Sequence, residues 1–522
     1  MLGRLVMIEI NNLSVWLKDP KQPSRKIVNN ISFNIPNGAI VALIGESGSG
    51  KTLTALSLLR LLPINFAYAA ASKIMLNNKN LLNLPEREMR KIRGADIAMI
   101  FQDPMTSLNP VLTVGSQVLE VLALHRNIKG RSAYTEVLRL FAAVQLPNPG
   151  QHFDSYPHEL SGGMQQRIMI AMALACKPSL LIADEPTTAL DVTTQAQILQ
   201  LLKELQQQEQ MSMLLITHDL AIASQLADQI VVMRAGEIVE QNTCREFFVA
   251  PKHEYSRQLL NAVPKLIPKF SPKLPETTTP LMQVTDLKVY FPIKSGLFRR
   301  TVGYTKAVDG VDFELKSGQT LAIVGESGSG KTTLAKAIIG LIPQSQGAVQ
   351  YIGGWHKKHS DLQIIFQNPY TALNPKLRII DSLRDGVGVT SAKIDALLKQ
   401  VGLSPEYKWR YPHEFSGGER QRLCIARALT VDPKVIICDE PTSSLDVSVQ
   451  AQVLKLLLDL QVEHNITYIF ISHDLKVVSA MAHNVAVMHA GKIVEYATCY
   501  EILTNPQHAY TKKLIAAVPR IN

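Results

Sequence analysis

The chain has 522 residues, of which 46% are hydrophobic and 19% charged, and this balance is that of an ordinary globular protein. No apolar run approaches 18 residues, so we expect no membrane-spanning helix. The net charge of +10 is compatible with binding to nucleic acid or to an anionic membrane surface and does not distinguish between them. The five cysteines form no C-x-x-C pair, which argues against zinc and redox sites.

The first informative segment is an apolar run, Ala39–Ile44, that predicts a buried parallel strand. After Lys51 the apolar residues Leu53 and Leu56 have the spacing of a helix. The loop between them fits G-x-x-x-x-G-K-[ST] and consists of Gly45, Glu46, Ser47, Gly48, Ser49, Gly50, Lys51 and Thr52. Its glycines let several N–H groups point into one concavity at a helix N-terminus, where anions are favoured. Lys51 would then reach the terminal phosphates of a nucleotide, and Thr52 would ligate Mg²⁺.

An identical loop occurs again in the second half of the chain, also behind an apolar strand. Its residues are Gly325, Glu326, Ser327, Gly328, Ser329, Gly330, Lys331 and Thr332. One match alone is weak evidence, because a glycine-rich turn before a helix is the ordinary alternative. Two identical strings in the same context predict that the chain binds two nucleoside triphosphates.

The chain is an internal duplication. The first copy is longer than the second by 15 residues between Lys51 and Gln102, and by 10 between Gln102 and Ser161. From Ser161 to Pro264 the two copies keep the same length. We therefore expect the length differences in peripheral loops or a helical insertion.

A boundary between two domains is predicted by composition. Residues 265–280 contain four prolines and three lysines, which is typical of a short, semi-extended linker. The predicted domains are therefore 1–264 and 281–522.

An apolar strand ending in two adjacent acids occurs in each copy. These acids are Asp184 and Glu185 in the first copy, and Asp439 and Glu440 in the second. The aspartates would hold Mg²⁺ directly or through water, and the glutamates would polarise an attacking water, as phosphoryl transfer requires. An Asp-Glu pair in a solvated loop is the ordinary alternative, and the buried strand before it favours the catalytic interpretation.

Each copy also has a Ser-Gly-Gly string at the expected start of a helix. Its residues are Ser161, Gly162 and Gly163, and Ser416, Gly417 and Gly418. The serines are predicted N-caps, and a helix N-terminus left bare by glycine is a second anion site. A simple capped helix is the alternative. Since the first loop already binds phosphates, a second anion site in each copy suggests that each nucleotide is shared.

With these strings the chain resembles the ATP-binding subunits of ABC transporters, over about residues 8–264 and 281–519. Further matches are Gln102 and Gln367 to the Q-loop, Ala189–Asp191 and Ser444–Asp446 to the D-loop, and His218 and His473 to the switch histidine. The resemblance implies an α/β fold with two tandem P-loop NTPase (RecA-like) domains, each with a helical and an antiparallel β subdomain.

The resemblance also implies two ATP molecules held between the copies. One site would join Lys51, Asp184, Glu185 and His218 to Ser416 and Gly418, and the other Lys331, Asp439, Glu440 and His473 to Ser161 and Gly163. The implied catalytic residues are Glu185, Glu440, His218, His473, Gln102 and Gln367. The implied Mg²⁺ ligands are Thr52, Thr332, Gln102, Gln367, Asp184 and Asp439. Neither copy lacks its glutamate or signature serine, so we predict that both sites hydrolyse ATP.

Adenine is expected to stack on an aromatic side chain near the start of each copy. Trp16 and Tyr290 occupy equivalent places. Phe291 and Tyr304 compete for this role in the second copy, and a plain strand aromatic is the alternative.

Two finer resemblances indicate the dipeptide, oligopeptide and nickel importers. One follows each Q-loop, at 103–110 and 368–375, and the other lies in the tails 251–260 and 506–515. A single chain of this length is similar to the ATPase of the microcin C/peptide importer type, and less so to the longer glutathione-importer type. Tyr255 and Tyr510 could dock their tails on a partner, but we expect docking on their own domain. Some relatives end in a cysteine cluster, and we predict no iron–sulfur cluster here.

The implied partners are two membrane permease subunits and a solute-binding protein, with the ATPase peripheral on the cytoplasmic face of the inner membrane and without cargo contact. Peptide, glutathione, nickel and antibiotic remain open as cargo. The alternative class is a soluble tandem ATPase acting on ribosomes or DNA. The short, proline-rich linker and the absence of zinc cysteine pairs argue against it.

Overall fold

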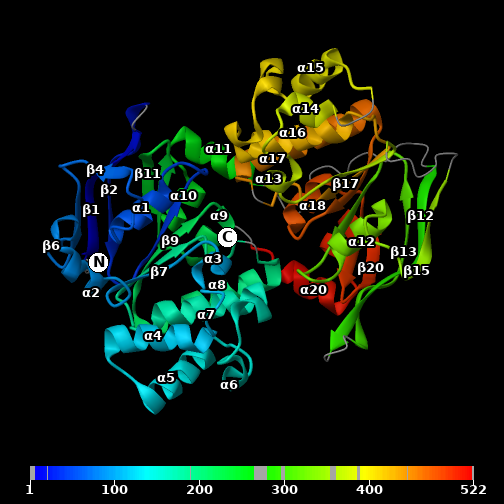
Figure 1. Cartoon of the computed structure of the whole chain (residues 1–522). Coiled ribbons are helices and arrows are strands. Elements are labelled where there is room, and N and C mark those ends of the chain that lie inside the picture. The colour runs from blue at the N-terminus through cyan, green and yellow to red at the C-terminus, as the bar shows by residue number, and fades with distance from the viewer. Residues whose placement is uncertain are drawn as a thin grey trace. The chain divides into compact units, whose positions relative to one another are not determined.

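The computed structural model describes residues 6–19, 22–188, 190–263, 279–295, 300–352, 360–384, 388–443 and 445–519. The chain divides into two compact units (Figure 1). The main division along the sequence falls between Asn261 and Ala262. Most of the predicted linker lies outside the described residues. Among the helices that are described, none is both long and apolar enough to cross a membrane.

The first unit is built on a six-stranded sheet with the order β11-β10-β3-β9-β8-β7. The strands β10, β3, β9, β8 and β7 run parallel, and β11 closes one edge as an antiparallel strand. Their bounds are β3 Ile40–Ile44, β7 Ile97–Ile100, β8 Leu180–Asp184, β9 Ser212–Thr217, β10 Gln229–Arg234 and β11 Glu237–Thr243. All five residues of β3 and of β8 are buried, as the two apolar runs predict.

Alternate residues of these strands serve two different cores. In β8, Leu180 and Ile182 pack into the core that contains Leu58 of the phosphate-loop helix and the antiparallel sheet. Leu181 and Ala183 pack into the core on the other face, with the helix that follows Ser161 and its neighbours. Successive strand residues point to opposite faces, so a fully apolar strand is what a sheet covered on both sides requires.

The antiparallel sheet of the first unit has the order β2-β1-β5-β6, and β4 pairs with β1. Its strands are β1 Val6–Asp19, β2 Gln22–Pro36, β4 Phe66–Tyr68, β5 Lys73–Leu76 and β6 Lys79–Asn80. The helices of the unit are α1 Lys51–Leu58, α2 Glu86–Ile92, α3 Pro104–Ser107, α4 Val114–Arg126, α5 Gly130–Ala143, α6 Pro149–His152, α7 Gly162–Leu174, α8 Val192–Glu209, α9 Leu220–Leu226, α10 Cys244–Val249 and α11 Glu254–Ala262. The 3₁₀ turns are η1 Leu81–Asn83 and η2 Pro157–Glu159. Helices α4 and α5 pack together against α7 and form the predicted helical subdomain (Figure 1).

The second unit repeats this plan, with a central sheet of order β16-β17-β18-β14-β19-β20 and an antiparallel sheet of order β13-β12-β15. Its strands are β12 Pro280–Ser295, β13 Arg300–Lys316, β14 Thr320–Val324, β15 Gln346–Tyr351, β16 Leu362–Ile365, β17 Val435–Asp439, β18 Thr467–Ile471, β19 Asn484–His489 and β20 Lys492–Thr498. Its helices are α12 Lys331–Ile339, α13 Pro369–Ala372, α14 Ile379–Arg384, α15 Ser391–Gln400, α16 Gly417–Leu429, α17 Val447–His464, α18 Leu475–Met481, α19 Cys499–Thr504 and α20 Ala509–Ala516. The 3₁₀ turns are η3 Pro405–Trp409 and η4 Pro412–Glu414.

The extra residues of the first copy lie where the sequence predicts them, away from the central sheet. Between α1 and β7 the first unit has β4, β5, β6 and α2, whereas β15 is the one element in the described part of the corresponding stretch of the second unit. In the helical subdomain, α4 and α5 have 13 and 14 residues, and their counterparts α14 and α15 have 6 and 10. Insertions at such peripheral positions leave the central sheet and its site unchanged.

Candidate ATP-binding and hydrolysis site

The phosphate loop of each unit joins the carboxyl end of a central strand to a helix N-terminus. The first loop runs from the end of β3 to Lys51, where α1 begins, and Gly50 at its N-cap has a left-handed φ of 101°. A Cβ on Gly45 would lie 2.2 Å from the backbone oxygen of Met233. Only glycine fits at that approach, so the spacing of glycines in the motif reflects packing as well as flexibility.

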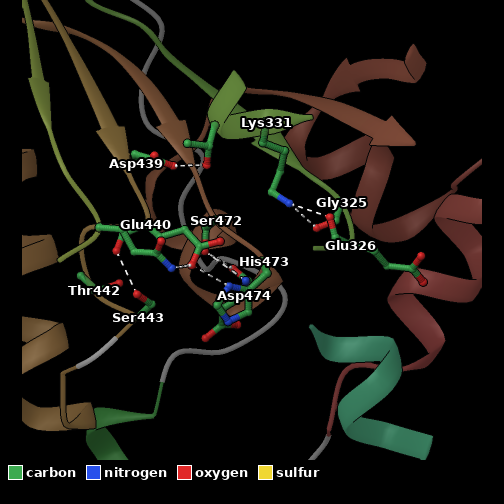
Figure 2. A network of polar contacts seen from close by, with 12 residues as sticks. Gly325, Glu326, Lys331, Asp439, Glu440, Thr442, Ser443, Ser472, His473 and Asp474 are labelled. Atoms are coloured by element: carbon green, nitrogen blue, oxygen red, sulfur yellow. Dashed lines mark hydrogen bonds and ion pairs between the residues drawn. The ribbon is translucent and has the colours of Figure 1, made fainter. Parts of the chain in front are cut away.

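The two motif lysines are buried and turn back into their own loops. Lys51 Nζ donates to the carbonyl oxygens of Gly45 and Glu46, each at 2.8 Å, and the residue is 6% exposed. Lys331 makes the same two contacts in the second unit, at 2.9 and 2.8 Å (Figure 2). Burial lowers the pKa of Lys331, and the carboxylates around it counteract this effect. Each ammonium therefore lies where the phosphate oxygens of a nucleotide would compete for it.

The threonine and aspartate predicted to hold Mg²⁺ are brought together in both units. Thr52 Oγ1 donates to Asp184 Oδ1 at 3.4 Å, and Thr332 Oγ1 to Asp439 Oδ1 at 3.1 Å. Burial is the main reason that the pKa of Asp184 rises to about 6, and burial also raises the pKa of Asp439. A bound cation would offset that burial. Adjacent hydroxyl and carboxylate oxygens are ligands that suit Mg²⁺, so these residues fit the ion.

Each predicted catalytic glutamate has an unusual backbone conformation. Glu185 and Glu440 have φ angles of +46° and +48°, in the left-handed region that non-glycine residues rarely adopt. Their N–H groups donate to Ile216 and Ile471 of the neighbouring strands, at 2.9 and 3.0 Å. The tertiary structure thus holds both residues in a conformation that costs on the order of 1–3 kcal/mol, as is common at functional sites.

The carboxylates of these glutamates bind the predicted glutamine and histidine. Gln102 Nε2 donates to Glu185 at 2.8 Å, and His218 Nδ1 lies 2.9 Å from the same carboxylate. Burial acts to raise the pKa of Glu185, but the contacts with His218 and Thr188 and the charge of Lys51 together outweigh it, so the pKa is lowered. Thr188 Oγ1 also donates to this carboxylate, at 2.9 Å, a contact that the sequence analysis missed because nothing in the motif marks this position.

The second unit repeats the arrangement (Figure 2). Gln367 Nε2 donates to Glu440 at 2.8 Å, and His473 Nδ1 lies 3.2 Å from the carboxylate. Burial acts to raise the pKa of Glu440, but the contacts with His473 and Gln367 and the charge of Lys331 together lower it overall. Burial lowers the pKa of His473, but the hydrogen bond to Glu440 and the negative charges of Glu440 and Asp474 together outweigh it, so that the net shift is upward. In both units the glutamine thus donates to the predicted catalytic glutamate.

The signature serines are N-caps, as predicted, but their two helices differ. Ser161 Oγ accepts a hydrogen bond from the N–H of Met164 at 3.4 Å. In the second unit Glu419 completes a capping box, since its carboxylate accepts from the N–H and the hydroxyl of Ser416 at 2.9 and 2.8 Å. Both serines are exposed.

The second glycine of each signature string has a packing role. A Cβ on Gly163 would lie 2.6 Å from Cγ2 of Thr194, and one on Gly418 would lie 2.3 Å from Cγ1 of Val449. The helix that follows the acidic strand therefore approaches this glycine closely. Packing adds a second reason for glycine here, besides leaving the N–H groups uncovered.

The candidate adenine-stacking residues occupy equivalent places, as predicted. Trp16 pairs across the antiparallel sheet with Lys26, whose Nζ lies 5.3 Å from the indole ring. Tyr290 pairs with Lys306, whose Nζ lies 5.5 Å from its ring, and its hydroxyl donates to Asp309. Stacking on adenine stays a prediction for both.

The tail of each copy docks on its own unit, as expected. Tyr255 in α11 and Tyr510 in α20 are 3% and 9% exposed. Tyr510 packs in one hydrophobic core with Leu475, Val487 and Ile502 of its own unit.

Comparisons with known proteins agree with this fold. The family model for the ABC transporter matches residues 28–188 and 308–443, and that for the oligopeptide/dipeptide transporter C-terminal region matches 239–288 and 494–522. The chain is 50% identical to "Peptidoglycan transport ATP-binding protein YejF" of Agrobacterium fabrum, over 94% of this chain and 92% of that protein. It is 45% identical to "Glutathione import ATP-binding protein GsiA" of Escherichia coli K12, over 98% of this chain and 89% of that protein.

Among solved structures, "RNase-L Inhibitor" matches with a TM-score of 0.61 and 19% identity, over 90% of this chain and 88% of that one, which supports the tandem fold alone. The fold and the motifs define an ATP-binding ATPase with two tandem P-loop domains. The chain belongs to the ABC transporter family, in the group with oligopeptide/dipeptide transporter C-terminal regions.

Proposed function

We propose that the chain couples ATP hydrolysis at two composite sites to the uptake of peptides or peptide-like compounds, of the microcin C type, through separate membrane subunits. Residues 1–264 and 281–522 would be its two ATPase domains, joined by a linker at 265–280. The observation that carries the proposal is that both units hold the same complete set of phosphate loop, acidic strand end, glutamine and histidine. Relatives named for peptidoglycan transport and glutathione import support transport of such compounds over the ribosome or DNA alternative.

Each unit would perform the same half of the chemistry. Lys51 and Lys331 bind the terminal phosphates, and Thr52 with Asp184, like Thr332 with Asp439, holds Mg²⁺, which neutralises charge on the phosphates when bound. The lowered pKa of Glu185 keeps it ionised at neutral pH, so its carboxylate can orient and polarise the attacking water.

The other half of each site would come from the opposite copy. Ser416 and Gly418 would complete the site of Lys51, while Ser161 and Gly163 would complete that of Lys331. The exposed serine at the N-terminus of each of these helices supports this role, because a helix N-terminus favours phosphate. ATP would then bridge the copies, and its hydrolysis would remove the bridge. That difference in binding between the ATP state and the product state would couple hydrolysis to transport.

The partners in this proposal are two permease subunits and a solute-binding protein, and the chain would be peripheral on the cytoplasmic face of the inner membrane. The ATPase would not contact the cargo. Glutathione and nickel are the alternative substrates, and the names of the two relatives support peptide-like compounds and glutathione over nickel.

The test is reconstitution of the full chain in proteoliposomes with two candidate membrane permease subunits. We expect ATPase activity to rise when a solute-binding protein loaded with short peptides is added, and labelled peptide to accumulate inside. A matched variant carrying both Glu185→Gln and Glu440→Gln should assemble equally well and accumulate nothing. Co-sedimentation of the chain with ribosomes, without association with either permease, would contradict the proposal.

A further inference from the structure

In both units a tyrosine of the tail reaches the phosphate loop. The backbone N–H of Glu46 donates to the hydroxyl of Tyr255 at 3.2 Å, and that of Glu326 donates to the hydroxyl of Tyr510 at 2.9 Å. Tyr255 comes 209 residues after its partner. The motif that binds phosphate thus has a hydrogen-bond partner in the last helix of its own unit.

This hydrogen bond and the motif lysine hold the same peptide group from opposite sides. The N–H of Glu46 and the C=O of Gly45 belong to one trans peptide and therefore point in opposite directions. The carbonyl accepts from Lys51 Nζ at 2.8 Å, while the N–H donates to Tyr255. Rotation of this peptide would break both contacts at once.

The glycine at this point explains why such a restraint is needed. Gly45 has no side chain that limits rotation of the peptide that follows it. A larger residue is excluded there, because a Cβ would lie 2.2 Å from the backbone oxygen of Met233. In the second unit a Cβ on Gly325 would meet the oxygen of Met488 at 2.1 Å. The tyrosine hydroxyl supplies from outside the loop the restraint that a side chain at this position cannot supply.

The tail that carries Tyr255 is itself held firmly. The carboxylate of Glu240 in β11 accepts the backbone N–H groups of Lys252 and His253, each at 2.9 Å. His253 Nδ1 in turn accepts the N–H of Tyr255 at 3.1 Å, and the guanidinium of Arg234 lies 4.7 Å from the tyrosine ring. These contacts leave the ring few ways to move.

The second unit has the same anchors with one exchange. Glu495 accepts the N–H groups of Gln507 and His508 at 2.7 and 3.0 Å, and His508 Nδ1 accepts that of Tyr510 at 3.2 Å. Where Arg234 covers the first tyrosine, His489 covers the second, with ring centroids 4.1 Å apart. The hydroxyl contact is therefore kept although the group covering the ring changes.

We propose that Tyr255 and Tyr510 are positioning residues for ATP binding, which hold the Gly45–Glu46 and Gly325–Glu326 peptides in the orientation that keeps the phosphate loops formed. The inference rests on the proposed role of these loops and is independent of the cargo. Both tyrosines lie within the regions matched by the C-terminal model, so that region gains a function at the nucleotide site.

The test replaces each tyrosine by phenylalanine in the full chain, because Tyr255→Phe and Tyr510→Phe remove only the hydroxyl. Matched controls are Tyr134→Phe and Tyr500→Phe, whose residues are 41% and 57% exposed. We expect Kd for a non-hydrolysable ATP analogue and KM for ATP to rise about three- to tenfold at the affected site, as for one lost hydrogen bond. We expect kcat to stay within about twofold, because the hydroxyl touches no group that reacts.

Amide hydrogen exchange provides a readout that a purely structural role of the tail would not produce. The loop peptide containing Glu46 should exchange faster in Tyr255→Phe, while the amides of α11 keep their protection. Unchanged Kd, KM and loop exchange, equal to those of Tyr134→Phe, would overturn the inference. Lys51→Ala distinguishes a failure of the proposed phosphate-loop function from a failure of the positioning role of the tyrosine. If Lys51→Ala leaves ATP binding unchanged, the proposed loop function fails as well. If Lys51→Ala abolishes binding while Tyr255→Phe has no effect, only the positioning role is refuted.

Discussion

Replacing Glu419 by glutamine should tighten ATP binding at the proposed composite site that includes Ser416. The carboxylate of Glu419 lies 2.8 Å from the hydroxyl of Ser416. A phosphate oxygen bound to that hydroxyl at about 2.8 Å would be no more than about 5.6 Å from the carboxylate. Two unit charges at this distance repel by about 0.7 kcal/mol in water and about 3 kcal/mol at an effective dielectric constant of 20.

The expected gain in affinity from Glu419→Gln is therefore between about threefold and about 150-fold. Glutamine also completes a capping box, so the helix start should keep its stability. The matched control is Met164→Gln at the equivalent position of the first copy, where no charge is removed, and its affinity should change less than about twofold.

The assay is a two-site titration of the full chain with a non-hydrolysable ATP analogue, at low and at high salt. The effect of Glu419→Gln should shrink at high salt, because ions screen the repulsion. Equal affinity in wild type and Glu419→Gln at low salt, or weaker binding in the variant, would show that Ser416 and its carboxylate do not face the triphosphate.

Three further predictions follow from the described contacts. Glu185→Gln or Glu440→Gln should each lower turnover at its own site by roughly 10²–10⁴ in single-turnover assays, and a variant with unchanged ATPase and transport would disprove two active sites. The hydrogen bond from Arg139 is the main cause that lowers the pKa of Glu136 from 4.5 to about 2. This lowered pKa stabilises the fold above about pH 4.5, and the stabilisation is lost as the pH falls through about 2. Because the carboxylate and its partners are partly exposed, Glu136→Gln should cost only about 1 kcal/mol in urea unfolding at pH 7, a difference that disappears toward pH 2, and a constant difference would refute the assignment. Glu495→Gln should speed amide exchange in α20 by about tenfold, since a charged acceptor of two tail N–H groups is lost, and unchanged exchange would show that this anchor is dispensable.

Much of the site could be predicted because its parts are local in the sequence. The strand before Gly45, the helix after Lys51 and the N-cap at Ser161 follow from patterns a few residues long. The family resemblance added that Gln102 and His218 act beside the acidic strand, and the structure places both against the carboxylate of Glu185, the predicted catalytic residue.

The tertiary structure alone decided the contacts between segments that lie far apart in the chain. The tyrosine was visible in both tails, but its target, the peptide after Gly45, was not, because 209 residues separate the two partners. The left-handed backbone conformation of Glu185 could not be predicted either, because the residue type does not indicate a conformation that neighbouring strands impose. The sequence by itself determined which groups the chain carries and the local elements that hold them. Their mutual orientation depends on packing between distant elements, which no short-range pattern encodes.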